Sequence, residues 1–233
     1  PDFDLRIVPA GVWARAGMTV PLTVYAIRRD GFDGPIDLSL DTPPGGFMLS
    51  GARIPAGLDR VTMTITCAPT EPMAATALRM RGTAVIGNAK VRHAARAAED
   101  MEQAFAYRHL VPAQEWLVTV AGRSFARPLE PFSPDRPVRI PLGGKVELRV
   151  QQVPAVRNRR VYLQLEDPPA GITMEATSGA SPLLTLTADA KQAREGTRGN
   201  LIIAAFVERP TTAQNRQAAA QRVLLGYLPA IPF

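Results

Sequence analysis

The amino-acid sequence predicts an all-β protein made of two tandem immunoglobulin-like β-sandwich domains. The first observation behind this fold class is a repeated phrase: IDLSLDTPPGGF at residues 36–47 returns as VYLQLEDPPAGI at residues 161–172. The second is the composition, because 22 prolines and 18 glycines among 233 residues suit short strands joined by turns. A chain of this length holds one large domain or two ordinary ones.

The repeat covers two consecutive predicted strands in which apolar residues alternate with others. The alternating residues are Val20, Leu22, Val24, Ile36, Leu38 and Leu40 in the first copy and Val146, Leu148, Val150, Val161, Leu163 and Leu165 in the second. Such period-two alternation is typical of a strand with one buried face. We therefore expect Leu22 and Leu38 in the core of the first copy. Their counterparts Leu148 and Leu163 should lie in the core of the second.

Each of these strands ends at Pro-Pro-Gly or Pro-Pro-Ala-Gly, where proline lacks a backbone donor and glycine accepts a positive φ. The parallel then continues, with three later pairs of matching segments. These are residues 60–66 with 182–187, residues 78–86 with 201–207, and residues 109–113 with 226–230. About seven strands in each copy indicate an immunoglobulin-like sandwich. We place the first domain at residues 1–122 and the second at residues 123–233, beginning with the proline-rich stretch 123–137.

One segment departs from the alternation. Ala98, Met101 and Phe105 follow each other at spacings of three and four, which predicts one or two turns of helix within residues 96–107. A helix this short is marginal by itself and would need packing on the sandwich. Its counterpart at residues 211–221 is polar and rich in Ala and Gln, and we leave its structure open.

The last predicted strand of the second copy looks incomplete. Aligning residues 109–116 with residues 226–233 matches Phe233 to Trp116. After this position the first copy has a further apolar strand at residues 117–120. A missing closing strand leaves unpaired backbone groups at an edge. We therefore expect that the polypeptide continues beyond Phe233 or that a neighbouring chain supplies the strand.

The charge of the chain is +6 with a pI near 10.1, and its basic residues are mostly arginine. Nucleic-acid binding would also require a recognisable module or aromatic stacking platforms, which the sequence lacks, so we expect no nucleic-acid partner. We expect no membrane insertion, because the longest apolar run, residues 201–207, is much shorter than a membrane-spanning helix of about 20 residues. Cys67, the single cysteine, falls on the inward face of its predicted strand and should be a buried, inert thiol.

Candidates for chemistry are few. His93 and His109 are the two histidines, and neither lies beside a nucleophile in a recognisable motif, so we expect no enzymatic activity, no catalytic residue and no cofactor. Asp30 and Asp33, in RRDGFDGP, could supply oxygen ligands to Ca²⁺. Asp-Gly is also the commonest signal for a tight hairpin turn, which we favour because the second copy has no carboxylate in the corresponding AVRNRR.

Both copies share a basic cluster after the first alternating strand. It comprises Arg28 and Arg29 in the first copy and Arg157, Arg159 and Arg160 in the second. The cluster is either an anion-binding loop or a solvated turn.

The two tryptophans bear on carbohydrate binding, which requires exposed aromatic side chains in a row. Trp116 precedes an apolar strand, which favours packing in the core or at a domain junction. For Trp13 the sequence leaves exposure and burial open.

Several phrases of the first copy resemble a known family. PDFDLRIVP, RRDGFDGPIDLSL, IPAG (residues 54–57) and RAAEDMEQAFAYRHLVPAQEWLV are similar to the immunoglobulin-like repeats that accompany bacterial pre-peptidase C-terminal (PPC) domains in large secreted proteins. The resemblance implies export to the periplasm, cell surface or medium, a longer parent chain, and a scaffold or adhesive role. It supplies no catalytic residue.

Together these observations predict a non-catalytic module that acts as a structural spacer and protein-interaction scaffold in a secreted or cell-envelope bacterial protein. Its partners would be other protein segments or domains of a larger chain or assembly. Two alternatives stay open: a carbohydrate or surface-ligand binding module of the adhesin type, and an accessory domain of a secreted hydrolase. Fold alone does not choose among them.

Overall fold

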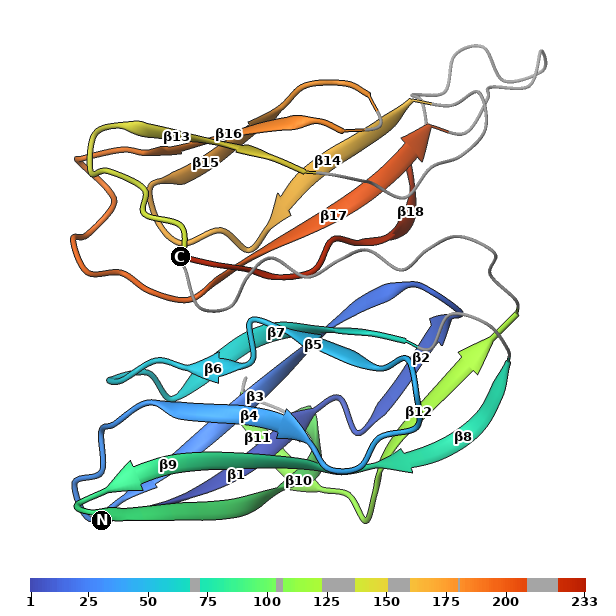
Figure 1. The fold of residues 1–233 in the computed structure, drawn as a ribbon, viewed down its shortest axis with the longest axis vertical. Helices are drawn as coiled ribbons and strands as arrows, with labels where there is room; N and C mark the ends of the chain where they lie inside the picture. Colours follow the sequence, from blue (N-terminus) through green and yellow to red (C-terminus); the bar gives the residue numbers. More distant parts are fainter. Residues whose placement is uncertain (68–71, 104–106, 123–136, 151–159, 180, 209–221) are drawn as a thin grey trace.

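The protein is all-β in the computed structural model (Figure 1), which describes residues 1–67, 72–103, 107–122, 137–150, 160–179, 181–208 and 222–233. Every regular element in these ranges is a β-strand, and no helix occurs in them. The predicted all-β class is therefore confirmed for the described part of the chain.

Twelve strands form the first half of the molecule, drawn blue to green in Figure 1. They are β1 (Asp2–Val8), β2 (Gly11–Arg15), β3 (Thr19–Arg29), β4 (Ile36–Leu40), β5 (Met48–Ser50), β6 (Arg53–Ile54), β7 (Arg60–Thr66), β8 (Met73–Leu78), β9 (Met80–Ile86), β10 (Ala89–Gln103), β11 (Tyr107–Pro112) and β12 (Trp116–Ala121). Strands β5, β7, β3 and β1 pair in that order, and β10, β9, β4 and β6 continue the path beyond a parallel β1–β10 pairing. A separate sheet has the order β2-β12-β8.

Seven strands of the second half lie in the described ranges, drawn yellow to red. They are β13 (Lys145–Arg149), β14 (Val161–Glu166), β15 (Ile172–Ala176), β16 (Leu183–Ala188), β17 (Asn200–Glu208), β18 (Arg222–Tyr227) and β19 (Ile231–Pro232). One sheet has the order β13-β16-β15, and the other has the order β14-β17-β18 with β19 paired to β17.

The strand pairing repeats in register between the halves. Leu38 of β4 lies opposite Gly82 of β9, and Leu163 of β14 lies opposite Ala205 of β17. For the other alternating strand, Val20 of β3 lies opposite Ile65 of β7, and Val146 of β13 lies opposite Leu186 of β16. The two strands that carry the alternating residues therefore occupy equivalent places in both halves, as the repeat predicts.

The repeated phrase also has the same backbone conformation at its turn. Thr42 and Asp167 occupy the same position of the phrase, just before the two prolines, and both have a positive φ, of 43° and 40°. Gly46 and Gly171, four residues further on, have φ of 91° and 77°. A side chain in the left-handed region is uncommon, so two such residues at one repeat position show that both halves share the geometry of this turn.

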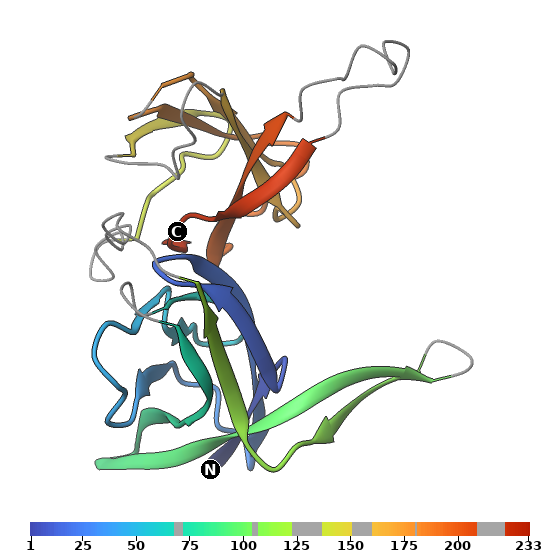
Figure 2. The same cartoon turned by 90° about the vertical axis from the view of Figure 1, so that its right-hand side faces the viewer.

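The helix expected within residues 96–107 is wrong. Strand β10 runs through this segment to Gln103 and pairs with β11, with Ala98 opposite Pro112 and Met101 opposite His109. We call residues 98–103 and 107–112 the arm. The arm stands away from the body of the first half in Figure 2. The spacing of three and four failed because a ribbon that leaves the core has no buried face to impose a period of two.

The register also corrects the alignment of His109 with Gly226. Gly226 lies opposite Ala205, which is the place that His93 takes opposite Gly82. The arm is thus an insertion into the first half, after the strand equivalent to β18. Residues 211–221 lie outside the described residues and follow β17, so they correspond in the chain to the β9–β10 turn.

The edge at the end of the second half is paired, which corrects the premise that it is open. Strand β19 pairs with β17, and Phe233 exchanges backbone hydrogen bonds with Gly199 at 3.0 and 3.3 Å. On the other side, the backbone N–H of Val138 donates to the carbonyl of Pro232 at 2.8 Å. An open edge therefore no longer supports the expectation that the polypeptide continues beyond Phe233, which stays a prediction.

Buried apolar side chains gather in two separate clusters. The first core draws on residues 3–120 and the second on residues 150–231. Leu22 and Leu38 are buried in the first core, as predicted, whereas Leu148 and Leu163 pack against the second core but are only partly buried. The predicted core position is therefore confirmed for the first pair, whereas the second pair lies at the border of its core, where the sheets cover it less completely.

This difference gives a matched test with one residue type at one repeat position. Leu38→Ala should lower the free energy of unfolding by about 2 to 5 kcal/mol, because it leaves a cavity in a closed core. Leu163→Ala should cost clearly less, because solvent and neighbouring side chains can fill the site. Urea denaturation of both variants measures the difference, and an equal or larger loss for Leu163→Ala would contradict the burial described above.

Candidate functional site

The two halves are joined by a hydrogen-bonded seam centred on Asn200, the first residue of β17. Its side-chain amide nitrogen Nδ2 donates to the backbone carbonyls of Gly51, at 2.8 Å, and of Thr62, at 2.9 Å. Gly51 has a φ of +70°, and a Cβ atom there would lie 2.2 Å from the Asn200 nitrogen. Only glycine therefore permits this close approach.

A second hydrogen bond crosses the seam beside the first. The backbone N–H of Ala230 donates to the Thr64 hydroxyl at 2.8 Å, and both residues are fully buried. Nearby, Gly226 of β18 lies against Met18, since a Cβ at Gly226 would be 2.4 Å from the methionine methyl group. Strands β17 and β18 of the second half thus pack on β7 and β3 of the first half.

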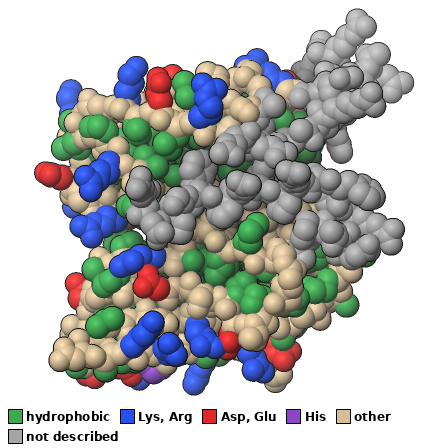
Figure 3. Space-filling model, viewed as in Figure 1, with side chains coloured by type: hydrophobic (Ala, Val, Ile, Leu, Met, Phe, Trp, Pro, Cys, Tyr) green, Lys and Arg blue, Asp and Glu red, His purple; other side chains and the backbone are tan. Residues whose placement is uncertain are grey.

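A groove of about 1290 Å³ opens along one side of the seam. One wall comes from Asp37 and residues 49–56 of the first half, and the other from residues 137–142 and 193–199 of the second half. The charged side chains among the described lining are Asp37, Arg53, Arg139, Arg194, Glu195 and Arg198. In Figure 3, basic side chains border the indentation on the left between the halves.

The charges of the groove do not cancel. Arg53 forms an ion pair with Asp37 at 3.2 Å. No ion pair of Arg139, Arg194 or Arg198 is found within the described part of the chain. All three are exposed, so the wall contributed by the second half presents a positive surface that Glu195 offsets only in part.

Arg28 does not form an anion site, because its guanidinium is turned inward. The side chain is only 10% exposed and donates to the carbonyls of Gly34 and Leu58, both within 2.8 Å, and to that of Pro55 at 3.2 Å. The guanidinium carbon also lies 5.3 Å from the centre of the Phe32 ring, in a cation–π contact. Arg28 thus ties β3 to the loop before β7.

The rest of the two basic clusters does not form a shared anion-binding loop either. Arg29 is on the surface and pairs with Asp4 at 2.5 Å. In the second half, Arg157 and Arg159 lie outside the described residues. Arg160 stacks over the ring of Tyr162, with 5.2 Å between the guanidinium carbon and the ring centre. The described arginines of the two clusters therefore make different contacts in the two halves.

Asp30 and Asp33 lie in the connection between β3 and β4. Asp30 and Gly31 have φ of 49° and 75°, and the backbone N–H of Phe32 donates to the carbonyl of Arg29 at 3.0 Å, which closes a tight turn. Because β3 and β4 are not neighbours in the strand order, this turn connects two unpaired strands and is not the tip of a hairpin. Within the described ranges, no three His, Cys, Asp or Glu side chains are grouped as metal ligands.

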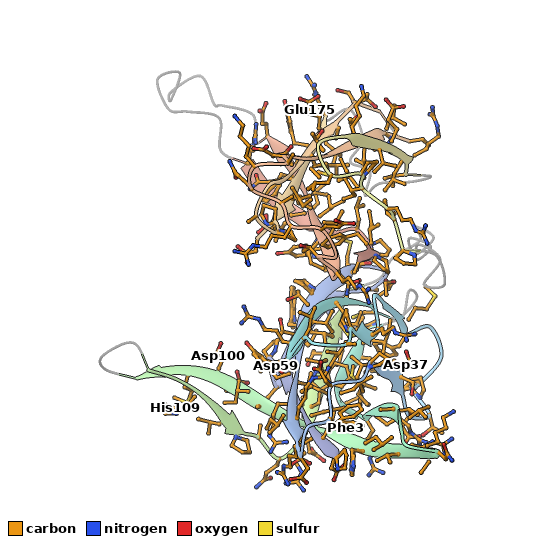
Figure 4. The ribbon with its side chains drawn as sticks, turned by 90° about the vertical axis from the view of Figure 1, so that its left-hand side faces the viewer. Phe3, Asp37, Asp59, Asp100, His109 and Glu175 are labelled. Carbon is orange, nitrogen blue, oxygen red and sulfur yellow. The ribbon has the colours of Figure 1, made fainter. Side chains whose placement is uncertain are left out.

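The two histidines have different surroundings. His93 of β10 is 2.8 Å from a carboxylate oxygen of Asp2 and packs edge-on against Phe3. Hydrogen bonds from the Phe3 backbone and from His93 lower the pKa of Asp2. His109 is exposed on the arm, as Figure 4 shows.

The cysteine and the tryptophans also have defined places. Cys67 is fully buried in the first core, and this burial raises the pKa of its thiol to about 11. Trp116 is buried in the same core, as the sequence favours. Trp13 on β2 is 64% exposed, which settles the alternatives left open for it.

Comparisons with known proteins identify no family. No family model matches the chain, and no curated protein matches it. Among solved structures, one titled "Marsupial T cell receptor" aligns over 97% of this chain and 99% of that chain, with 10% sequence identity and a TM-score of 0.29. A TM-score this low carries no argument about fold or function. No helix in the described ranges has the length and hydropathy that crossing a membrane requires.

The groove and the seam were missed from the sequence. Asn200 stands at the start of an apolar strand, and its partners are backbone carbonyls, which leave no trace in side-chain patterns. One signal was present in the sequence. By strand register, Asn200 takes the place that Ala77 has in the first half. A polar residue where the other copy has an apolar one indicates a contact that the other copy does not make.

Arg28 and Arg29 provide a matched pair for testing the inward arginine. Arg28→Lys should lower the free energy of unfolding by about 1 to 3 kcal/mol, because an ammonium group cannot reach the same carbonyls and leaves some of them unsatisfied. Arg29→Lys should change it by less than about 0.5 kcal/mol, since exposed ion pairs contribute little. Thermal and urea unfolding of both variants provide the measurement. Equal effects would show that the Arg28 contacts are not stabilising.

Cys67 gives a chemical test of the core. In the folded protein at pH 8, the thiol should react with Ellman's reagent far more slowly than in urea, because it is buried and its raised pKa keeps it protonated. The rate of thionitrobenzoate release with and without urea measures this protection. A folded-state rate close to that of the unfolded chain would contradict the burial of Cys67, which directly follows β7.

Proposed function

We propose that the protein is a non-catalytic module of two tandem immunoglobulin-like β-sandwiches, residues 1–122 and 123–233, serving as a rigid spacer and protein-interaction scaffold. The shared strand register and the two separate cores support the division into two sandwiches. In each half, both groups of repeated strands contribute to one core, β7 and β9 in the first half and β16 and β17 in the second, as in a sandwich of this class.

The observation that carries the proposal is the seam at Asn200. A flexible linker alone would leave two domains free to reorient, and interfaces inside a chain are commonly mobile. Here a side-chain amide binds two carbonyls of the other half, and a buried hydroxyl accepts a third hydrogen bond. Breaking the seam would leave buried polar groups unsatisfied, which favours a fixed orientation.

The setting we propose is a secreted, periplasmic or cell-surface protein of a bacterium, in which this module holds other domains apart and contacts protein partners. The resemblance of residues 1–9 and 28–40 to PPC-associated repeats supports this setting. Neither nucleic acid nor a membrane is a partner in this proposal.

Carbohydrate binding is the second candidate, favoured by the exposed ring of Trp13. Its neighbour Gly11 has open space where a Cβ would be, so the ring stands beside a flat stretch of β2. A single ring gives less support than a row would. The third hypothesis, an accessory domain of a hydrolase, depends on other domains of the parent protein.

The test of the spacer function is the orientation of the two halves in solution. Wild-type protein should give a small-angle X-ray scattering curve that a single arrangement of the two halves reproduces. Asn200→Ala should increase the radius of gyration and broaden the distance distribution, because two hydrogen bonds across the seam are lost. Gln164→Ala, which removes an exposed amide from β14, is the matched control and should leave the curve unchanged.

Two outcomes would contradict the proposal. A wild-type curve that requires many arrangements would show that the halves are not fixed. Identical curves for wild type and Asn200→Ala would show that the seam does not depend on the amide. Circular dichroism of each variant verifies that both halves remain folded.

A further inference from the structure

We propose that the arm binds in the groove of a second copy of this chain, so that copies associate head to tail. The inference rests on the proposed function, since it names the partner of an interaction module. It draws on four observations: an arm that is anchored at its base by buried Ala98 and by a hydrogen bond from the Ala10 backbone to Glu99 and exposes apolar side chains further out, a groove of opposite charge, a fit of shape, and the placement of the two on opposite sides.

The arm is a two-stranded ribbon with apolar side chains in solvent. Its base is closed where the backbone N–H of Ala113 donates to the carbonyl of Ala97 at 2.9 Å, and beyond this point β10 and β11 pair only with each other in the described part of the chain. Met101 is 53% exposed and Val111 is also exposed. A lone hairpin is marginally stable in water, so packing on another surface would stabilise this one.

The charge of the arm is opposite to that of the remaining chain. Residues 98–112 contain three acidic residues, Glu99, Asp100 and Glu102, against the single basic residue Arg108, a formal charge of −2. Because the whole chain carries +6, the rest carries +8. A strongly basic surface favours an acidic partner, and copies of this chain provide one in the arm.

The groove carries a formal charge of the same size as that of the arm and of opposite sign. Its described lining holds four arginines and two acidic residues, a formal charge of +2. The excess lies on Arg139, Arg194 and Arg198, for which no ion pair is found in the described ranges. A docked arm would place its acidic residues near these guanidinium groups, which prefer carboxylates.

The shapes are compatible. The six paired residues on each strand give the arm a length of about 20 Å, and with strands about 4.8 Å apart and β layers about 10 Å apart, half of this length with its side chains fills about 1000 Å³. The groove of about 1290 Å³ accepts a piece of this size. The groove has two walls and the ribbon two faces, with Met101 and Val111 on one face and Asp100 and Leu110 on the other.

The placement of the two surfaces makes the contact intermolecular. In Figure 4, Asp100 and His109 of the arm lie on one side of the molecule, whereas Asp37 in the groove wall lies on the opposite side. An arm therefore cannot reach the groove of its own chain. A contact between two different surfaces is heterologous, and it repeats from copy to copy into rings or open chains.

The experiment measures the association of the purified chain by sedimentation velocity over a concentration series. It is done at about 0.1 M and about 1 M salt, where the Debye length falls from about 10 Å to about 3 Å. Wild-type protein should form dimers and larger species at the lower salt and dissociate at the higher. Asp100→Arg on the arm and Arg194→Asp in the groove should each weaken association at least about tenfold, because each places like charges together.

Mixing the two variants gives the sharpest result. Asp100→Arg keeps an intact groove for the arm of Arg194→Asp, and its reversed arm is complementary to the reversed groove, so the mixture should recover an association in which the two variants alternate. Arg92→Asp, which changes the same charge on an exposed part of β10 outside the arm and groove, should associate like wild type. A chain in which Asn-Gly replaces residues 100–110 keeps the base of the arm and should be monomeric.

Several outcomes would overturn the inference. One is a wild-type chain that stays monomeric at every concentration in low salt. Another is association that survives replacement of the arm. Association that depends on the arm but not on Arg194 would indicate arm-to-arm pairing and would equally refute docking in the groove. In each case, a scattering curve that still fits one fixed arrangement of the halves would leave the spacer function standing, so the two proposals fail separately.

Discussion

The arrangement of this molecule depends on one side-chain amide. Asn200 donates to two carbonyls of the first half, and the absence of a side chain at Gly51 lets it approach. Without that contact, β17 and β7 would have no polar link at this point, and the walls of the groove would not keep a fixed distance. The groove is therefore a consequence of the seam. Any ligand or partner bound in it contacts both halves, so its binding depends on their relative orientation.

The strands were predictable wherever a core imposes alternation. Leu22, Leu38 and the other alternating residues of the first half lie in strands as expected, because burial of one face forces a period of two. Leu163, expected in the core, only borders it, because how completely a strand is covered depends on loops and edges that alternation does not describe. Sequence pattern thus located the strands but not the depth of their burial.

The arm and the seam could not be predicted for a common physical reason. Beyond Ala98, which is buried at its base, the described part of the arm has no buried face, so nothing selects a period of two, and the chance spacing of Ala98, Met101 and Phe105 resembled a helix. Asn200 contacts backbone carbonyls, which are the same in every residue. Both features lie where side-chain hydrophobicity no longer determines the structure, and both are differences between two copies that otherwise match.

These differences explain how one sandwich type can supply two complementary surfaces. The arm interrupts the path from β10 to β12, yet the Ala113–Ala97 hydrogen bond closes it, so β12 resumes its pairing with β8. Since lengthening a closed connection costs little entropy, the fold tolerates this insertion without disturbing the core. The second half lacks a described counterpart of the arm and instead presents Arg194 and Arg198 in the loop before β17. Duplication provides two similar bodies, and changes confined to their connections give one an acidic projection and the other a basic wall.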